Sequence, residues 1–210
     1  MNHVFEFFFG QYAEYETSDI ALEIVAVIFG FMSVWFSKQN KVLVFPTGMI
    51  STIIFVYLLL KWELLGDMMI NAYYFIMSVY GWYIWTKKVD TLRVTPISKT
   101  TYNEKKISIA IFLATLLFVY LVYKSFDKWT SWVAYVDTIT TAIFFVGMWL
   151  MAKRKLENWI FWIIGDIISV PLYFYKGFTF TSLQYLGFTF IAIFGYIAWK
   201  KNINNSPQTV

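Results

Sequence analysis

The stretch ENWIFWIIGDIISVPLYFY, residues 157–175, decides how the whole chain is interpreted. From Trp159 onward it is a run of 17 residues with a single charge, Asp166, near its middle. Trp162 precedes this charge by four residues and Trp159 precedes Trp162 by three. A carboxylate in hydrocarbon costs about 2.5–3.5 kcal/mol on insertion scales, so a membrane helix normally turns it toward the interior of its bundle.

The composition of the chain points to a lipid bilayer as its surroundings. Of its 210 residues 59% are hydrophobic and only 14% are charged, and the mean hydropathy is +0.58. A soluble domain carries about 25% charged residues. Seven apolar runs have at least 17 residues, enough to cross about 30 Å of hydrocarbon. The runs are Ile20–Phe36, Val42–Leu60, Leu64–Thr86, Ile107–Tyr123, Trp129–Ala152, Trp159–Tyr175 and Phe178–Trp199. We therefore expect an all-α membrane protein with seven transmembrane helices; the alternative is a soluble helical protein with unusually apolar helices.

The positive charges between these runs predict an orientation. The loops and termini outside the runs lie alternately on the two sides of the membrane, and those on one side carry 13 Lys and Arg residues in total, against 4 on the other side. Loops rich in Lys and Arg stay in the cytoplasm. We therefore expect the N-terminus outside and the C-terminus in the cytoplasm, an arrangement that requires an odd number of spans.

The two ends of the chain repeat each other. A shift of 114 residues aligns Glu23–Lys87 with Asp137–Lys201 without a gap. The matched identities include Trp35 with Trp149, Gly81 with Gly195, and Trp85 with Trp199. Equivalent runs lie four apart and cross in the same direction, which predicts a parallel repeat of 3+1+3 helices. Parallel repeats occur in transporters, whose substrate sites lie between the halves near the midplane.

This repeat divides the chain into five expected parts. They are an extracytoplasmic N-terminal segment (1–19), a first three-helix repeat (20–86), a basic loop with a linking helix (87–128), a second three-helix repeat (129–199) and a cytoplasmic tail (200–210).

Polar and aromatic residues form stripes on the predicted helices. The intervals along each stripe are three or four residues, which places its members on one helix face. The candidate site residues from these stripes are Asn71, Tyr74, Trp159, Trp162 and Asp166, with Ser51, Asp137, Thr141 and Gln184 from other runs. We expect them to line a central cavity. Alternatively, Ser and Thr pack helices together, and Trp and Tyr anchor helix ends at the interface.

Other chemistry finds little support in the sequence. The single histidine, His3, lies outside the spans, and cysteine is absent. No cluster has the composition of a metal site, no nucleophile–base pair is visible, and no glycine-rich phosphate loop occurs. The last run has no lysine that could bind retinal. We expect a passive or ion-coupled permease that is not an enzyme and has no cofactor, metal or nucleic acid partner. A cation or proton channel and a structural membrane scaffold remain alternatives.

Three motifs carry a family resemblance. ENWIFWIIGDIISV (157–170), YGWYIW (80–85) and FTFIAIFGYIAW (188–199), at their separations, resemble the PnuC family of bacterial vitamin transporters over nearly all of residues 20–201. The resemblance implies SWEET-like 3+1+3 helices in the bacterial cytoplasmic (inner) membrane. It also implies facilitated diffusion of nicotinamide riboside, trapping by a cytoplasmic kinase that phosphorylates the substrate, and homo-oligomers, possibly trimers.

The resemblance also assigns roles to particular residues. Trp159 and Trp162 match the tryptophans of the motif, and Asn71 falls where many members have an amide. Asp166 stands where members typically have Asn, and Phe45 where the first-half motif usually has Trp. Relatives carry thiamine, riboflavin or deoxynucleosides, and thiamine stays the alternative substrate. Nicotinamide riboside and thiamine share a cationic aromatic ring, which a carboxylate and aromatic side chains attract, with cation–π contacts worth about 0.5–2 kcal/mol.

Overall fold

The computed structural model describes residues 16–62, 65–90, 93–127, 131–175 and 179–205. Most of the predicted N-terminal segment 1–19 and the second half of the predicted tail 200–210 lie outside these residues. The first residues of three predicted spans, Leu64, Trp129 and Phe178, also lie outside them.

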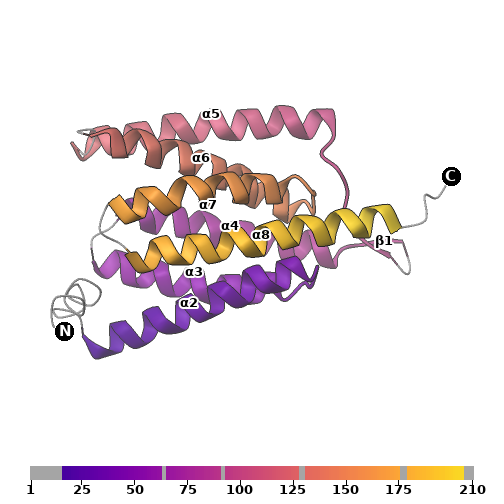
Figure 1. The fold of residues 1–210 in the computed structure, drawn as a ribbon, viewed down its shortest axis with the longest axis horizontal. Coiled ribbons are helices and arrows are strands. Elements are labelled where there is room, and N and C mark those ends of the chain that lie inside the picture. Colours follow the sequence, from indigo (N-terminus) through magenta and orange to yellow (C-terminus); the bar gives the residue numbers. More distant parts are fainter. Residues whose placement is uncertain (1–15, 63–64, 91–92, 128–130, 176–178, 206–210) are drawn as a thin grey trace.

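The described residues form seven helices that lie side by side in one bundle, and successive helices run in opposite directions (Figure 1). The helices are α2 (Thr17–Lys38), α3 (Val44–Lys61), α4 (Leu65–Thr86), α5 (Tyr102–Ser125), α6 (Trp132–Ala152), α7 (Asn158–Tyr175) and α8 (Thr179–Asn205). A short antiparallel hairpin of β1 (Lys88–Asp90) and β2 (Arg93–Val94) connects α4 to the loop before α5. The all-α prediction did not include this hairpin, because two strands of two or three residues leave no alternating pattern in the sequence.

Six of the seven helices are long and apolar enough to cross a membrane. The chain is therefore a multi-pass, helical membrane protein, as its composition predicted. The helix that does not meet the criterion is α4, whose apolar run is interrupted by Asp67 and Asn71. That α4 also crosses the membrane stays a prediction. It packs against α3 and α6, among helices that do meet the criterion.

The helix boundaries recur at the interval found in the sequence. The bounds of α3, shifted by 114 residues, coincide with those of α7. With the same shift, the last residue of α2 falls on the last residue of α6, and the first residue of α4 on the first residue of α8. Within each group the second helix packs on both others, and the contacts of α2 with α8 and of α4 with α6 join the groups. The remaining helix, α5, packs mainly against α6.

The helices α2 and α6 end in the same left-handed turn. Asn40 has a φ angle of 57° and Arg154 a φ angle of 59°. In each turn this residue's N–H donates to a carbonyl three residues earlier, and the next N–H donates to a carbonyl five residues earlier. This is the Schellman arrangement, in which glycine is the usual residue and asparagine the common substitute. An arginine at this place is unusual, because a side chain disfavours the left-handed conformation.

The loop before α5 is bonded to the turn between α6 and α7. Ser98 N donates to Arg154 O at 3.2 Å and Leu156 N donates to Ser98 O at 2.9 Å. Lys155 Nζ contacts Ser98 Oγ at 2.9 Å and Glu104 Oε2 at 3.0 Å. Glu104 also completes a capping box with Thr101 at the start of α5. These bonds join the loop and the turn into one structural unit.

Candidate functional site

A cavity of about 230 Å³ lies between the two groups of three helices. Its lining comes from α2, α3, α4, α6, α7 and α8, and no described residue of α5 takes part. Seven of the ten predicted site residues belong to this lining. They are Ser51, Asn71, Tyr74, Trp159, Trp162, Asp166 and Gln184. That these side chains contact a substrate stays a prediction.

The stripe on α7 supplies the charge of the cavity. Trp159, Trp162 and Asp166 lie at positions i, i+3 and i+7, so all three share the helix face that lines the cavity. Asp166 is only 2% exposed, and its carboxylate accepts no hydrogen bond from the part of the chain that the structure describes. A buried carboxylate without a partner is costly. The site is therefore suited to a ligand that brings a positive charge or hydrogen-bond donors.

Aromatic rings line the same cavity as this carboxylate. The Phe144 ring centroid lies 5.5 Å from that of Trp162 and 5.9 Å from that of Tyr185, with which it stacks. The Tyr74 ring lies 6.3 Å from Trp162. Such rings offer flat faces for an aromatic ligand and negative faces for a cation.

A glycine beside the aspartate makes room for one of these rings. A methyl group on Gly165 would lie 2.3 Å from Cε1 of Phe144, far inside van der Waals contact. The position of Phe144 in the cavity wall therefore depends on the glycine that precedes Asp166. Phe144 could not be identified from the sequence, because a phenylalanine in an apolar run gives no sign of facing a cavity.

The part of the lining that α2 and α3 contribute consists mainly of small residues and residues with hydroxyl groups. Ser33 Oγ donates to Val44 O at 2.7 Å and Ser51 Oγ donates to Ala26 O at 2.8 Å. Thr52 Oγ1 donates to Gly48 O at 2.8 Å, one turn earlier in its own helix. Because these hydroxyl protons are bonded to the backbone, the oxygens can face a ligand as acceptors. The aromatic wall, with Asp166, thus comes from α6, α7 and α8 together with Tyr74 of α4, and the hydroxylated wall comes from α2 and α3.

Three predicted site residues lie outside the described lining of the cavity. Asp137 accepts a hydrogen bond from the Tyr123 hydroxyl of α5 at 3.1 Å. Phe45 is fully buried and packs edge-on against Trp85, with ring centroids 5.0 Å apart. Thr141 is half-buried on α6. The positions of the Asp137 and Phe45 side chains are therefore explained by contacts within the bundle.

Four large aromatic side chains pack together at one end of the bundle, and one of them, Trp159, belongs to the cavity lining. Phe45, Trp85, Trp159 and Trp199, which we call the aromatic layer, are each at most 2% exposed. Trp159 meets Trp199 edge-on at 5.5 Å, the counterpart of the Phe45–Trp85 pair one repeat earlier. The Trp159 Nε1–H has no hydrogen-bond partner in the described residues, although it is buried. This layer lies at the end of the bundle where α2 and α6 end.

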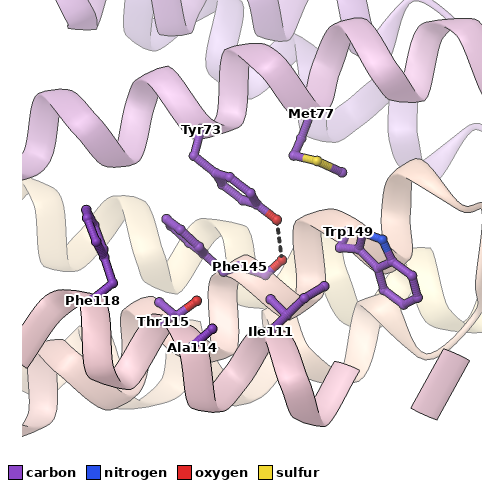
Figure 2. Close-up of a pocket in the computed structure, with 8 residues that line it drawn as sticks. All are labelled: Tyr73, Met77, Ile111, Ala114, Thr115, Phe118, Phe145 and Trp149. Carbon is purple, nitrogen blue, oxygen red and sulfur yellow. Dashed lines mark hydrogen bonds between the residues drawn. The ribbon is translucent and has the colours of Figure 1, made fainter. Parts of the chain in front are cut away.

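A second hollow, of about 320 Å³, lies on the outside of the bundle between α4, α5 and α6 (Figure 2). Tyr73 points from α4 to α6, where its hydroxyl donates to Phe145 O at 3.0 Å and its ring stacks on that of Phe145 at 3.9 Å. The rest of the lining is apolar except for Thr115. This hollow contains none of the predicted site residues, so the polar cavity between the two helix groups is the candidate site.

Comparison with known proteins identifies the family. Residues 20–201 match the family model described as nicotinamide mononucleotide transporter. The chain belongs to this family. The nicotinamide mononucleotide transporter family consists of membrane transporters rather than enzymes, and the match confirms the resemblance found in the sequence motifs.

Individual relatives of this family differ in their substrates. The nicotinamide riboside transporter PnuC of Escherichia coli (strain K12) is 23% identical over 205 residues, which cover 85% of this chain and 84% of the relative. The riboflavin/roseoflavin transporter RibM of Streptomyces davaonensis is 28% identical over 130 residues, which cover 59% and 58% of the two chains. A crystal structure of the vitamin B3 transporter PnuC has a TM-score of 0.66 and 23% identity, and covers 90% of this chain and 84% of that one. The chain therefore has the PnuC fold, and the names of its relatives do not agree on one vitamin.

Proposed function

We propose that the chain imports a cationic, nucleoside-like vitamin, nicotinamide riboside, by facilitated diffusion. The observation that carries this proposal is the placement of the Asp166 carboxylate among Trp162, Phe144 and Tyr74 in one cavity. A pyridinium ring can stack on the aromatic wall while its charge interacts with the carboxylate. The hydroxylated wall can accept hydrogen bonds from a ribose.

The size of the cavity supports a small ligand. Its volume of about 230 Å³ is below the range of about 300–1,000 Å³ for cavities that hold drug-sized molecules. A nucleoside with a single-ring base suits this volume better than a tricyclic flavin, although a riboflavin transporter is among the relatives. Thiamine, which is also cationic, is the alternative substrate. It lacks a ribose, and so it would make less use of the hydroxylated wall.

The proposed mechanism uses a parallel 3+1+3 arrangement of the SWEET type. It is supported by the recurrence of helix boundaries at 114 residues and by the equivalent aromatic pairs in the two groups. The cavity lies between the groups, where parallel-repeat transporters bind their substrates. Movement of one group against the other would open the cavity to each side in turn.

The proposed setting is the bacterial inner membrane, with the C-terminus in the cytoplasm. The uneven distribution of Lys and Arg residues supports this orientation. The aromatic layer then faces the cytoplasm. A cytoplasmic kinase that phosphorylates the substrate would make uptake one-way, because the acidic cavity disfavours an anionic product. The kinase partner and a homo-oligomer, possibly a trimer, rest on the family resemblance alone.

Binding and uptake by the purified protein test this function. Titration calorimetry should show tighter binding of nicotinamide riboside than of thiamine. Proteoliposomes should take up nicotinamide riboside down its gradient without ATP or an ion gradient. Preference for thiamine would change the substrate and keep the mechanism. Strict dependence on a proton or sodium gradient would contradict facilitated diffusion and make Asp166 the candidate for ion coupling.

A further inference from the structure

Two reciprocal hydrogen bonds cross between the helix groups at the aromatic layer. Trp85 Nε1 donates to Met151 O of α6 at 3.2 Å, and Trp199 Nε1 donates to Ser37 O of α2 at 3.0 Å. Donors and acceptors are both equivalent under the 114-residue repeat. The two indoles also contact each other, with ring centroids 5.7 Å apart. Each group thus caps the last turn of a helix in the other group.

Arg154 lies next to this layer and contacts three separate parts of the chain. Its Nε and Nη2 both approach Asn40 Oδ1, at 2.9 Å and 2.7 Å. Its Nη1 donates to the Thr95 carbonyl at 2.5 Å, and its guanidinium lies over the Trp85 ring at 4.4 Å from the centroid. Burial lowers the pKa of this guanidinium to about 10, so it is still charged at neutral pH.

The backbone at Arg154 indicates that its side chain is needed there. Its φ angle of 59° is in the left-handed region, where glycine is unstrained and a long side chain is disfavoured. Its equivalent in the first repeat, Asn40, is a residue that tolerates this conformation well. The chain therefore keeps an arginine where the turn alone would favour glycine, and the guanidinium meets the equivalent turn of the other repeat.

The contacts around Arg154 are unequal in strength. On one side, the loop at Ser98 is joined to the turn between α6 and α7 by both backbone and side-chain bonds. On the other side, the turn at Asn40 is joined to them through the Arg154 side chain. If the two helix groups separate at this end, the Arg154–Asn40 contact, the two indole bonds and the bond from Ser37 Oγ to Met151 Sδ at 3.5 Å must break.

We propose that Arg154 is the latch that holds the cavity closed at the end where α2 and α6 end, by binding Asn40 of the opposite helix group. The proposal extends the proposed transport function, because a carrier must open this end to release its substrate. Arg154 does not line the described cavity, so it acts as a positioning residue through the aromatic layer and not by contact with the substrate.

Accessibility of a single cysteine tests the latch without any substrate. The chain has no cysteine, so Ser78→Cys introduces one thiol in the cavity lining. Ser78 lies on α4, about 10 Å along the helix from Trp85. A membrane-impermeant maleimide added on the side of the aromatic layer should label this thiol slowly. Adding Asn40→Gly, which keeps the left-handed turn and removes the acceptor, should speed labelling from that side by about tenfold to a hundredfold.

Two further variants of Arg154 and one control variant define the result. Arg154→Gly relieves the backbone and removes the guanidinium, and should speed labelling at least as much as Asn40→Gly. Arg154→Lys keeps the charge without the planar fork and should fall between them and the parent. Asp127→Gly is the matched control, because Asp127 also has a positive φ angle, 51°, but follows α5. It should leave labelling unchanged.

The outcomes separate the latch from a merely structural role. Faster labelling from the aromatic-layer side only, in variants that remain folded, supports the latch. Equal rates in Asn40→Gly and the parent overturn it, and so does a similar increase from both sides of the membrane or in Asp127→Gly. If Arg154→Gly does not fold, Asn40→Gly and Arg154→Lys still decide the question. Because no vitamin is used, failure of the proposed substrate leaves this test intact.

Discussion

Replacement of Asp166 by Asn isolates the charge of the cavity from its shape. The two side chains have nearly the same size, and the amide keeps the ability to hydrogen-bond. Asp166 is 2% exposed and lies on the cavity wall with Trp162. We expect Asp166→Asn to weaken the binding of nicotinamide riboside, whose pyridinium ring is cationic. Binding of the reduced form, whose ring is uncharged, should change much less.

The expected magnitude follows from the burial of the carboxylate. Two unit charges 4 Å apart attract each other by about 4 kcal/mol at an effective dielectric constant near 20. Loss of the ligand's hydration offsets part of this attraction, and an interaction with a charged partner has a net value of about 1.5–3 kcal/mol. The dissociation constant for the cationic form should therefore rise by about one to two decades.

Titration calorimetry on purified protein in detergent measures this effect. The parent, Asp166→Asn and Trp162→Ala are each titrated with the cationic and the reduced ligand. Trp162→Ala should weaken the binding of both forms, because stacking does not require the charge. The difference between the two ligands thus distinguishes the role of the carboxylate from that of the aromatic wall.

Equal affinity of the parent and Asp166→Asn for the cationic ligand would refute the reasoning. So would loss of folding on this substitution, measured as an early thermal transition, because Asp166 would then support helix packing and not the ligand. An equal loss of affinity for both ligands would show that the carboxylate contacts a shared part, such as the ribose.

Three further predictions follow from contacts described above. Gly165→Ala should displace Phe144, because the added methyl group would lie 2.3 Å from its ring. Titration should therefore show weaker binding of the ligand. Gly187→Ala is the control and should have little effect on binding, because the nearest atom to its added methyl group would lie at 3.7 Å. Trp199→Phe removes the bond to Ser37 O and should lower the free energy of unfolding by about 1 kcal/mol, seen as a lower melting temperature; an unchanged melting temperature would contradict this. A reporter fused to the C-terminus should be active only in the cytoplasm, and periplasmic activity would reverse the proposed orientation.

The helices could be predicted from the sequence because apolar length alone defines them. The predicted run Trp159–Tyr175 differs from α7 by one residue, since the loop residues before it are charged. Prediction was less accurate for α5 and α8, which extend beyond the apolar runs Ile107–Tyr123 and Phe178–Trp199. Polar residues continue these helices outside the hydrocarbon, and α5 begins at the capping box of Thr101, which hydropathy does not detect.

The lining of the cavity was most readily predicted where polar residues repeat along one helix. On α7, the spacing of Trp159, Trp162 and Asp166 placed the three residues on one face, and this face lines the cavity. On α6, the shorter pattern of Asp137 and Thr141 did not predict the described lining, because Asp137 instead accepts a hydrogen bond from α5. Two residues four apart define a helix face but not the neighbour that this face meets. The contribution of Phe144 depends on a glycine in another helix, and such a pairing is visible only in three dimensions.

The helix α5 packs mainly on α6 and has no described residue in the cavity lining. This limited packing bears on how such a chain could arise. A unit of three membrane crossings begins and ends on opposite faces of the bilayer. If two copies of this unit were joined end to end, they would be inserted with inverted topologies relative to each other. One extra crossing between them restores the same orientation to both. In the proposed arrangement α5 therefore acts as a topological spacer, and its sequence is constrained by hydropathy and by its contact with α6 more than by the ligand.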